Sequence, residues 1–174
     1  MHFFEVLSQR RSIHRFRPRA VEADKLQALL DAAAAAPSAG NLQAYEIVVL
    51  ANPDAPTRRA LAEAALHQEL FESAPTLLIF CADAERSRSE YGERGASLFA
   101  VQDATLAAAY AQLAATALDL GSCWVGAFDE DRMRTLLRLP PGLRPVAVIA
   151  IGHAAEQPAR PPHRSIKDLV RRYA

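Results

Sequence analysis

Apolar residues recur along the chain in two patterns: short continuous runs, and longer stretches with helical spacing. The short runs predict strands over residues 45–51, 76–82, 123–128 and 145–152. The helical spacing predicts helices over residues 3–9, 21–36, 57–72, 98–120 and 129–137. Helices and strands alternate, but several connections are long. The pattern therefore allows an α+β layered fold with a mixed sheet as readily as a doubly wound fold.

The longest predicted helix covers residues 98–120 and would measure roughly 35 Å at about 1.5 Å per residue. Its larger apolar side chains repeat at spacings of four and three: Leu106, Tyr110, Leu113, Ala117 and Leu120. We interpret this stripe as the face of a central core helix. The alanine-rich surface of the same helix permits close packing, so we also expect it to contribute to a dimer interface.

Local signals mark several helix ends. Pro37 disfavours helical geometry in the residue before it and so ends the second helix. Asp129 is predicted to cap the helix that ends at Leu137. Ser165 and Asp168 resemble a capping box, which predicts a helix near the C-terminus.

Composition limits the class of protein. The chain has 174 residues, of which 51% are hydrophobic and 23% are charged, so we expect one folded domain over residues 1–174. The 20 basic residues balance the 20 acidic ones, which argues against a nucleic-acid partner bound by bulk charge. The apolar runs are too short to span a bilayer, and the N-terminus lacks the pattern of a secretory signal. We therefore expect a cytoplasmic protein with no membrane partner.

Familiar catalytic motifs are missing from the sequence. No glycine pattern matches a P-loop or a dinucleotide-binding fold, and no histidines have the HExxH spacing. Cys81 and Cys123 are too few and too far apart for a disulfide framework or a structural zinc site, so no metal site is predicted. Cys123 and His153 form a conceivable nucleophile pair, although free cysteine is commonly a small buried residue. If the chain is an enzyme, we expect a bound cofactor to supply the difficult chemistry.

The densest cationic segment follows the first predicted helix. Arg10, Arg11 and the Ser12 hydroxyl could bind an anion through charge-assisted hydrogen bonds. Alternatively, these cations only cap the helix and stay solvated, since a helix C-terminus carries partial negative charge.

A second polar segment, residues 37–43, joins a helix to a strand. Its Asn41 and Gln43 amides offer both donors and acceptors, which suits recognition of the edge of a heterocycle. The alternative is an ordinary connecting loop.

Together these segments resemble the FMN-dependent nitroreductase family. The pieces that carry the resemblance are RRSIHRF at 10–16, PSAGNLQ at 37–43, and two longer runs at 91–131 and 143–170. They occur in the family's order and cover nearly the whole chain. The resemblance implies an α+β, nitroreductase-like layered fold with a central mixed, mainly antiparallel sheet flanked by helices. It also implies an intertwined homodimer, whose two FMN sites are each built from both chains.

The resemblance also implies which residues bind the cofactor. The family's phosphate contacts map onto these residues: Arg10, Arg11, Ser12 and, near the C-terminus, Arg164. A one-residue shift would replace Arg164 with His163, and Arg160 is a weaker candidate. The contacts to the isoalloxazine ring map onto side chains of the second segment and onto a backbone loop: Ser38, Asn41, Gln43, Val125, Gly126 and Ala127.

The sequence departs from the family pattern at several positions. His14 stands where family members usually carry Arg or Lys, and we include it in the cofactor site. A titrating imidazole there leads to the hypothesis that FMN affinity depends on pH. Ala44 and Tyr45 replace a frequent Pro-Trp pair. The chain is short for the family, so we expect an open pocket without a large capping insertion.

The resemblance implies a ping-pong oxidoreductase. NADH or NADPH would deliver hydride to FMN, and a nitroaromatic, a quinone or a related small acceptor would then be reduced. No protein side chain is predicted to act as an essential catalytic acid or base. Alternatives are another flavin reaction on the same fold, such as dehydrogenation, dehalogenation or flavin breakdown, or a flavin-binding protein without turnover.

Overall fold

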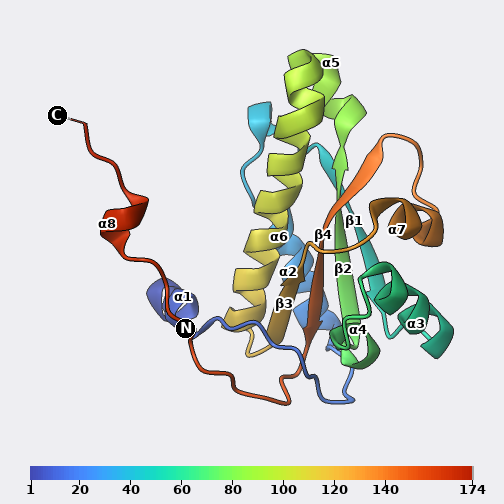
Figure 1. The fold of residues 1–174 in the computed structure, drawn as a ribbon, viewed down its shortest axis with the longest axis vertical. Helices are drawn as coiled ribbons and strands as arrows, with labels where there is room; N and C mark the ends of the chain where they lie inside the picture. The colour runs from blue at the N-terminus through green and yellow to red at the C-terminus, as the bar shows by residue number, and fades with distance from the viewer. Residues whose placement is uncertain (174) are drawn as a thin grey trace.

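An antiparallel sheet lies at the centre of the computed structural model, which describes residues 1–173 (Figure 1). Its four strands occur in the order β1-β2-β4-β3. They are β1 (Tyr45–Ala51), β2 (Thr76–Asp83), β4 (Leu143–Gly152) and β3 (Gly121–Val125). Every neighbouring pair of strands is antiparallel, and a parallel bridge joins Ser12 to Ser122 in the edge strand β3. The expected α+β class is confirmed, and the doubly wound alternative is wrong.

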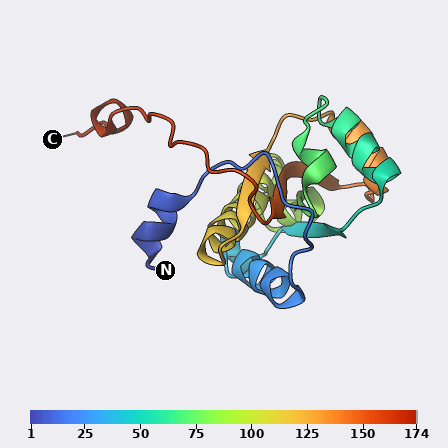
Figure 2. The same ribbon diagram turned by 90° about the horizontal axis from the view of Figure 1, so that it is seen from below.

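Helices cover both faces of the sheet (Figures 1 and 2). One face carries α2 (Ala23–Ala34) and α6 (Ala100–Ala117). The other carries α3 (Ala55–Ala64), α4 (Leu70–Ser73) and α7 (Glu130–Leu137).

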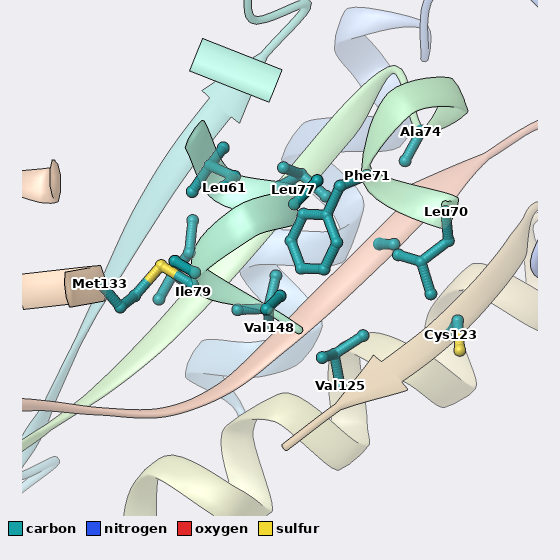
Figure 3. Packing of buried hydrophobic residues seen from close by; sticks show 14 of the residues in the cluster. Leu61, Leu70, Phe71, Ala74, Leu77, Ile79, Cys123, Val125, Met133 and Val148 are labelled. Atoms are coloured by element: carbon teal, nitrogen blue, oxygen red, sulfur yellow. The ribbon is translucent and has the colours of Figure 1, made fainter. Parts of the chain in front are cut away.

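Two hydrophobic cores result, because successive side chains of a strand point to opposite faces. In β2, Leu78 and Phe80 face α2 and α6, whereas Leu77 and Ile79 face the other helices. Figure 3 shows Leu77 and Ile79 in this second core. Burial on both faces explains why β2 is an uninterrupted apolar run in the sequence.

The two ends of the chain project from this layered body on the same side (Figures 1 and 2). They carry α1 (Phe3–Gln9) and the single-turn helix α8 (Ile166–Leu169). Phe4 is 77% exposed and Ile166 is 70% exposed. The Ser165 hydroxyl caps this very short helix by accepting a hydrogen bond from the Lys167 N–H. The Asp168 N–H donates to the Ser165 carbonyl instead, so the predicted capping box is not formed.

Two predicted helices differ from the observed ones. The helix expected over 57–72 is split into α3 and α4, because Leu66 and His67 adopt left-handed φ values of 57° and 59°. The helix expected over 98–120 is preceded by α5 (Ala84–Arg94) and by the π-helix η2 (Gly95–Phe99). The sequence analysis did not predict α5, which Asp83 caps by accepting from the Arg86 N–H.

Within α6 the larger residues of the predicted apolar stripe face outward, so its interpretation as the core side is wrong there, whereas Leu120, which follows α6, is buried in the core. Leu106 and Tyr110 are 38% and 40% exposed. The face that packs on the sheet consists largely of alanines: Ala100, Ala104, Ala107, Ala108, Ala111 and Ala115. Small side chains let the helix lie close to the sheet, which leaves the larger residues outside.

The third strand ends earlier than predicted. It covers Gly121–Val125 rather than 123–128. After Val125 the chain leaves the sheet, and the Asp129 N–H bonds to the Ala64 carbonyl at 2.7 Å. The Asp129 carboxylate accepts from the Arg132 N–H, as the predicted cap of α7 requires.

Candidate functional site

The segment that follows α1 runs beside the edge strand β3. The Ile13 N–H donates to the Ser122 carbonyl at 3.0 Å. Residues 158–163 lie across from this segment, and a cavity of about 310 Å³ separates the two. We call it the basic pocket, after the polar side chains that line it: Arg10, Arg11, Ser12, His14, Arg160 and His163. No acidic residue lines it among the residues the structure describes, so the pocket favours an anion.

Arg10 and Arg11 of the basic pocket differ in the hydrogen bonds that their side chains make within the chain. Arg11 donates through Nη1 to the Ser8 and Arg10 carbonyls at 2.7 and 2.8 Å, so it caps the C-terminal end of α1. The Arg10 side chain makes no hydrogen bond or ion pair within residues 1–173 and remains available to a ligand. Arg11 therefore caps the helix, as one alternative expects, whereas Arg10 is free to bind an anion, as the other expects.

Near the C-terminus, the structure places His163 and Arg160 at the basic pocket and Arg164 outside its lining. Arg164 donates through Nη2 to the Asp168 carbonyl at 2.9 Å. Within one chain, Arg10, Arg11 and Ser12 therefore share the basic pocket with Arg160 and His163. Arg164 does not line it.

His14 lies between the basic pocket and β3. Its backbone N–H donates to Glu156 Oε1 at 2.5 Å, and its ring Nε2 is 4.0 Å from Cys123 Sγ. Burial raises the pKa of the Cys123 thiol, Glu156 adds to the rise, and Arg10 opposes it. The thiol is thus kept neutral, which disfavours a nucleophilic role.

The conceivable pairing of Cys123 with His153 is wrong. His153 Nε2 instead lies 3.1 Å from Glu22 Oε2, where it ties the end of β4 to the start of α2.

The second polar segment forms a tight turn around the 3-10 helix η1 (Ala39–Asn41). We call residues 38–43 the polar turn. Gly40, Asn41 and Gln43 have left-handed φ values of 56°, 55° and 51°. Glycine tolerates this region freely, and asparagine is among the residues enriched there.

Hydrogen bonds within the polar turn leave its ligand-binding groups free. The Ser38 hydroxyl accepts from the Gln43 N–H at 2.9 Å, and Gln43 Nε2 donates to Asn41 Oδ1 at 3.3 Å. The hydroxyl hydrogen of Ser38, the side-chain amide N–H groups of Asn41 and the side-chain oxygen Oε1 of Gln43 are thus still available. Such an alternation of donors and acceptors suits the edge of a heterocycle.

Asp103, near the start of α6, is a site residue that the sequence analysis missed. Its side chain is buried, and it accepts from the Ala39 N–H at 3.0 Å and from the Ala44 N–H at 3.3 Å. Burial raises the pKa of Tyr45, and the nearby Asp103 charge contributes. The feature of the sequence that could have indicated Asp103 is a carboxylate in an otherwise alanine-rich helix.

An aromatic pair packs against the polar turn. Tyr91 and Phe99 stack edge to face with ring centroids 5.2 Å apart, and the Arg94 guanidinium lies 5.6 Å from the Phe99 centroid. A Cβ on Gly40 would lie 2.4 Å from the Tyr91 hydroxyl, so only glycine leaves that hydroxyl in place. Phe99 also lines a cavity of about 550 Å³ together with Ser38 and Leu106.

The predicted backbone loop of Val125, Gly126 and Ala127 lies at the end of β3. The Ala127 carbonyl accepts from Gln68 Nε2 at 3.0 Å, which fixes the loop to the connection between α3 and α4. His14 is close to the same strand through its 4.0 Å contact with Cys123. The loop therefore continues the strand that His14 contacts beside the basic pocket.

The basic pocket and the polar turn lie at opposite ends of α6. Asp103 near the N-terminus of the helix holds the turn, whereas Thr116 near its C-terminus lines a cavity together with Arg11 and Ile13. A rise of about 1.5 Å per residue separates Asp103 from Thr116 by roughly 20 Å along the axis. One chain by itself does not bring the two halves of the predicted site together.

The described residues lack two further features. Within residues 1–173, no helix has both the length and the apolar character needed to cross a membrane. Over the same residues, no three His, Cys, Asp or Glu side chains gather as metal ligands would.

Comparisons with known proteins agree with this architecture. A profile described as the nitroreductase family matches residues 7–153. The NADH dehydrogenase of Thermus thermophilus is 33% identical over 90% of this chain and 88% of its own length. The FMN reductase (NADPH) of Bacillus subtilis is 29% identical over 91% of this chain and 68% of its own length.

Solved structures show the same likeness. NfrA2 of B. megaterium has a TM-score of 0.90 and 26% identity, and the match covers 100% of this chain and 75% of that one. The NADPH:FMN oxidoreductase from Vibrio harveyi, complexed with NAD+, has a TM-score of 0.89 and 26% identity over 99% of this chain and 77% of that one. The predicted layered fold is thereby confirmed.

Proposed function

Because the chain belongs to the nitroreductase family, we propose that it is an FMN-dependent oxidoreductase. In this proposal NADH or NADPH is the electron donor, and a nitroaromatic, a quinone or a related small molecule is the acceptor. The basic pocket carries the proposal, since it gathers Arg10, Ser12, Arg160 and His163 around a cavity of about 310 Å³ that no acidic side chain of residues 1–173 lines. Relatives named as an FMN reductase and an NADPH-flavin oxidoreductase support the same donor and cofactor.

The residues on the two surfaces fit the two ends of FMN. The basic pocket offers guanidinium and hydroxyl donors to a phosphate. The polar turn offers free donors and acceptors to the edge of the flavin ring. FMN, when bound, supplies the hydride chemistry, and the chain binds and orients it. Ser38, Asn41 and Gln43 would orient the ring, and Arg10, Ser12 and His163 would hold the phosphate.

A homodimer with shared FMN sites is part of the proposal. The two halves of the site are separated by roughly 20 Å along α6. A second copy related by twofold symmetry could place its polar turn beside the first copy's basic pocket. The exposed Leu106 and Tyr110 of α6, and the projecting α1 and α8, supply apolar surface for such an interface.

The experiment is an absorbance spectrum of the purified protein, followed by anaerobic addition of NADH or NADPH. A bound flavin that bleaches and then recovers on addition of a quinone or a nitroaromatic supports both halves of the reaction. A bound flavin that neither nucleotide bleaches would indicate another flavin reaction or a flavin carrier. If no flavin binds after FMN is supplied, the proposed function is wrong.

A further inference from the structure

The Asp103 carboxylate is a buried charge, and no cation pairs with it among residues 1–173. Its side chain is only 2% exposed, on the alanine-rich face of α6. Removing a charge from water is costly, and an apolar side chain in such a place is often equally or more stabilising. A role in core stability alone therefore does not explain a carboxylate at this position.

The partners of Asp103 point to a more specific role. Oδ1 accepts from the N–H of Ala39 and Oδ2 from the N–H of Ala44. These two residues flank the left-handed stretch that contains Gly40, Asn41 and Gln43. Ala44 is fully buried, so its N–H has no access to water and depends on this acceptor.

Nearly all other backbone N–H groups of the turn are also hydrogen-bonded. Asn41 and Leu42 donate to the carbonyls of Ser38 and Ala39, each at 3.0 Å, and Tyr45 donates to the Gln43 carbonyl at 2.7 Å. Gln43 donates to the Ser38 hydroxyl. From residue 39 to residue 45, only the exposed Gly40 N–H has no acceptor within the described chain.

We propose that Asp103 is a positioning residue, whose buried carboxylate clamps both ends of the polar turn in the conformation that binds the flavin ring. The inference rests on the proposed function, because the turn is assigned to FMN there. The clamp leaves three donors free to bind a ligand: the Gly40 N–H, the Ser38 hydroxyl hydrogen and the Asn41 side-chain N–H groups. With the turn already ordered, binding does not have to order it, and affinity rises accordingly.

Asp103→Asn tests the clamp with nearly the same shape. The Asn carbonyl oxygen can accept from one of the two N–H groups, while its NH₂ group faces the other N–H, donor to donor. Amide exchange of a peptide that covers residues 38–44 should become roughly 10-fold faster or more. FMN affinity should weaken by about 10-fold or more, because only the fraction of molecules with an ordered turn binds. The visible circular dichroism of saturated flavin should also change.

Asp54→Ala is the matched control. The Asp54 carboxylate accepts from the Thr57 N–H at 2.9 Å at the start of α3, on the opposite face of the sheet. This variant also loses a bond from a carboxylate to a backbone N–H. It should leave FMN affinity and exchange at residues 38–44 unchanged, so any effect of general destabilisation is separated from the clamp.

Ala39→Pro disrupts the same contact from the other side, should Asp103→Asn fail to fold. Proline removes the N–H that donates to Oδ1. Ser38 is extended, with φ −140° and ψ 157°, which a following proline accepts. This variant should reproduce the loss of FMN affinity.

The outcomes separate the clamp from the proposed function. Wild-type FMN affinity and unchanged exchange in Asp103→Asn would overturn the clamp and leave the proposed function intact. If the wild-type protein binds no FMN, the proposed function fails, and exchange at residues 38–44 in Asp103→Asn still decides whether the clamp exists.

Discussion

A shared site makes a quantitative prediction for mixtures of two damaged chains. Arg10→Glu would damage the basic pocket and leave the polar turn intact. Asn41→Asp would do the reverse, because it keeps a residue that tolerates the left-handed φ of 55° but replaces amide donors with a negative carboxylate. In a mixed dimer, one site receives both damaged halves and the other receives both intact halves.

The size of the effect follows from the site. A hydrogen bond to a charged group contributes about 1.5–3 kcal/mol. Loss of the Arg10 contact therefore weakens binding by roughly 10-fold to 100-fold, and the added negative charge weakens it further. If the two chains pair at random, half of the dimers are mixed and each has one intact site of two. About a quarter of all sites then regain wild-type affinity.

The assay measures FMN bound per protein at an FMN concentration above the wild-type Kd and below that of either variant. The two variants are co-expressed or refolded together, and each variant alone provides the baseline. We expect both baselines to be near zero and the mixture to bind roughly a quarter of the wild-type amount. If the mixture is as empty as each variant although mixed dimers are present, the site lies within one chain and the shared-site reasoning is refuted.

Three further predictions concern single residues. Tyr110→Glu puts a charge in the outward stripe of α6 and should shift the protein from dimer to monomer in sedimentation experiments. Gly95→Ala should lower the free energy of unfolding by about 1–2 kcal/mol in urea, because the new Cβ would lie 2.4 Å from the Ser87 carbonyl oxygen and this clash outweighs the gain in helix propensity. Burial raises the pKa of Cys81 to about 12, so native protein at pH 8 should resist alkylation there and react only once unfolded.

The sequence was most informative where one residue type has one local effect. The apolar run of β2 and the cap at Asp129 were both found at their observed places, because burial on two faces and a free carboxylate before a helix leave direct signals. The split between α3 and α4 was missed, since leucine does not favour a left-handed backbone and the enrichment of histidine there is too weak to predict one at His67.

The orientation of α6 shows why periodicity alone is insufficient. Leucines and tyrosines at helical spacing indicate a face that avoids water, but they do not distinguish a protein core from a second subunit. Alanines on the opposite face carry little hydrophobic signal, although they pack on the sheet. Asp103 was missed because its hydrogen-bond partners, the N–H groups of Ala39 and Ala44, lie more than 50 residues away in the sequence.

The two halves of the site are built by different means, and this bears on how they would bind. The polar turn is held by its own hydrogen bonds and by a buried carboxylate in α6, so its shape is fixed within one chain. The basic pocket lies between the segment that follows α1 and residues 158–163, and both lead into the ends of the chain that project from the layered body (Figure 2). Its geometry therefore depends on whatever these segments pack against. We expect the ring-binding half to be preformed in each chain, and the phosphate-binding half to reach its final geometry on dimerisation.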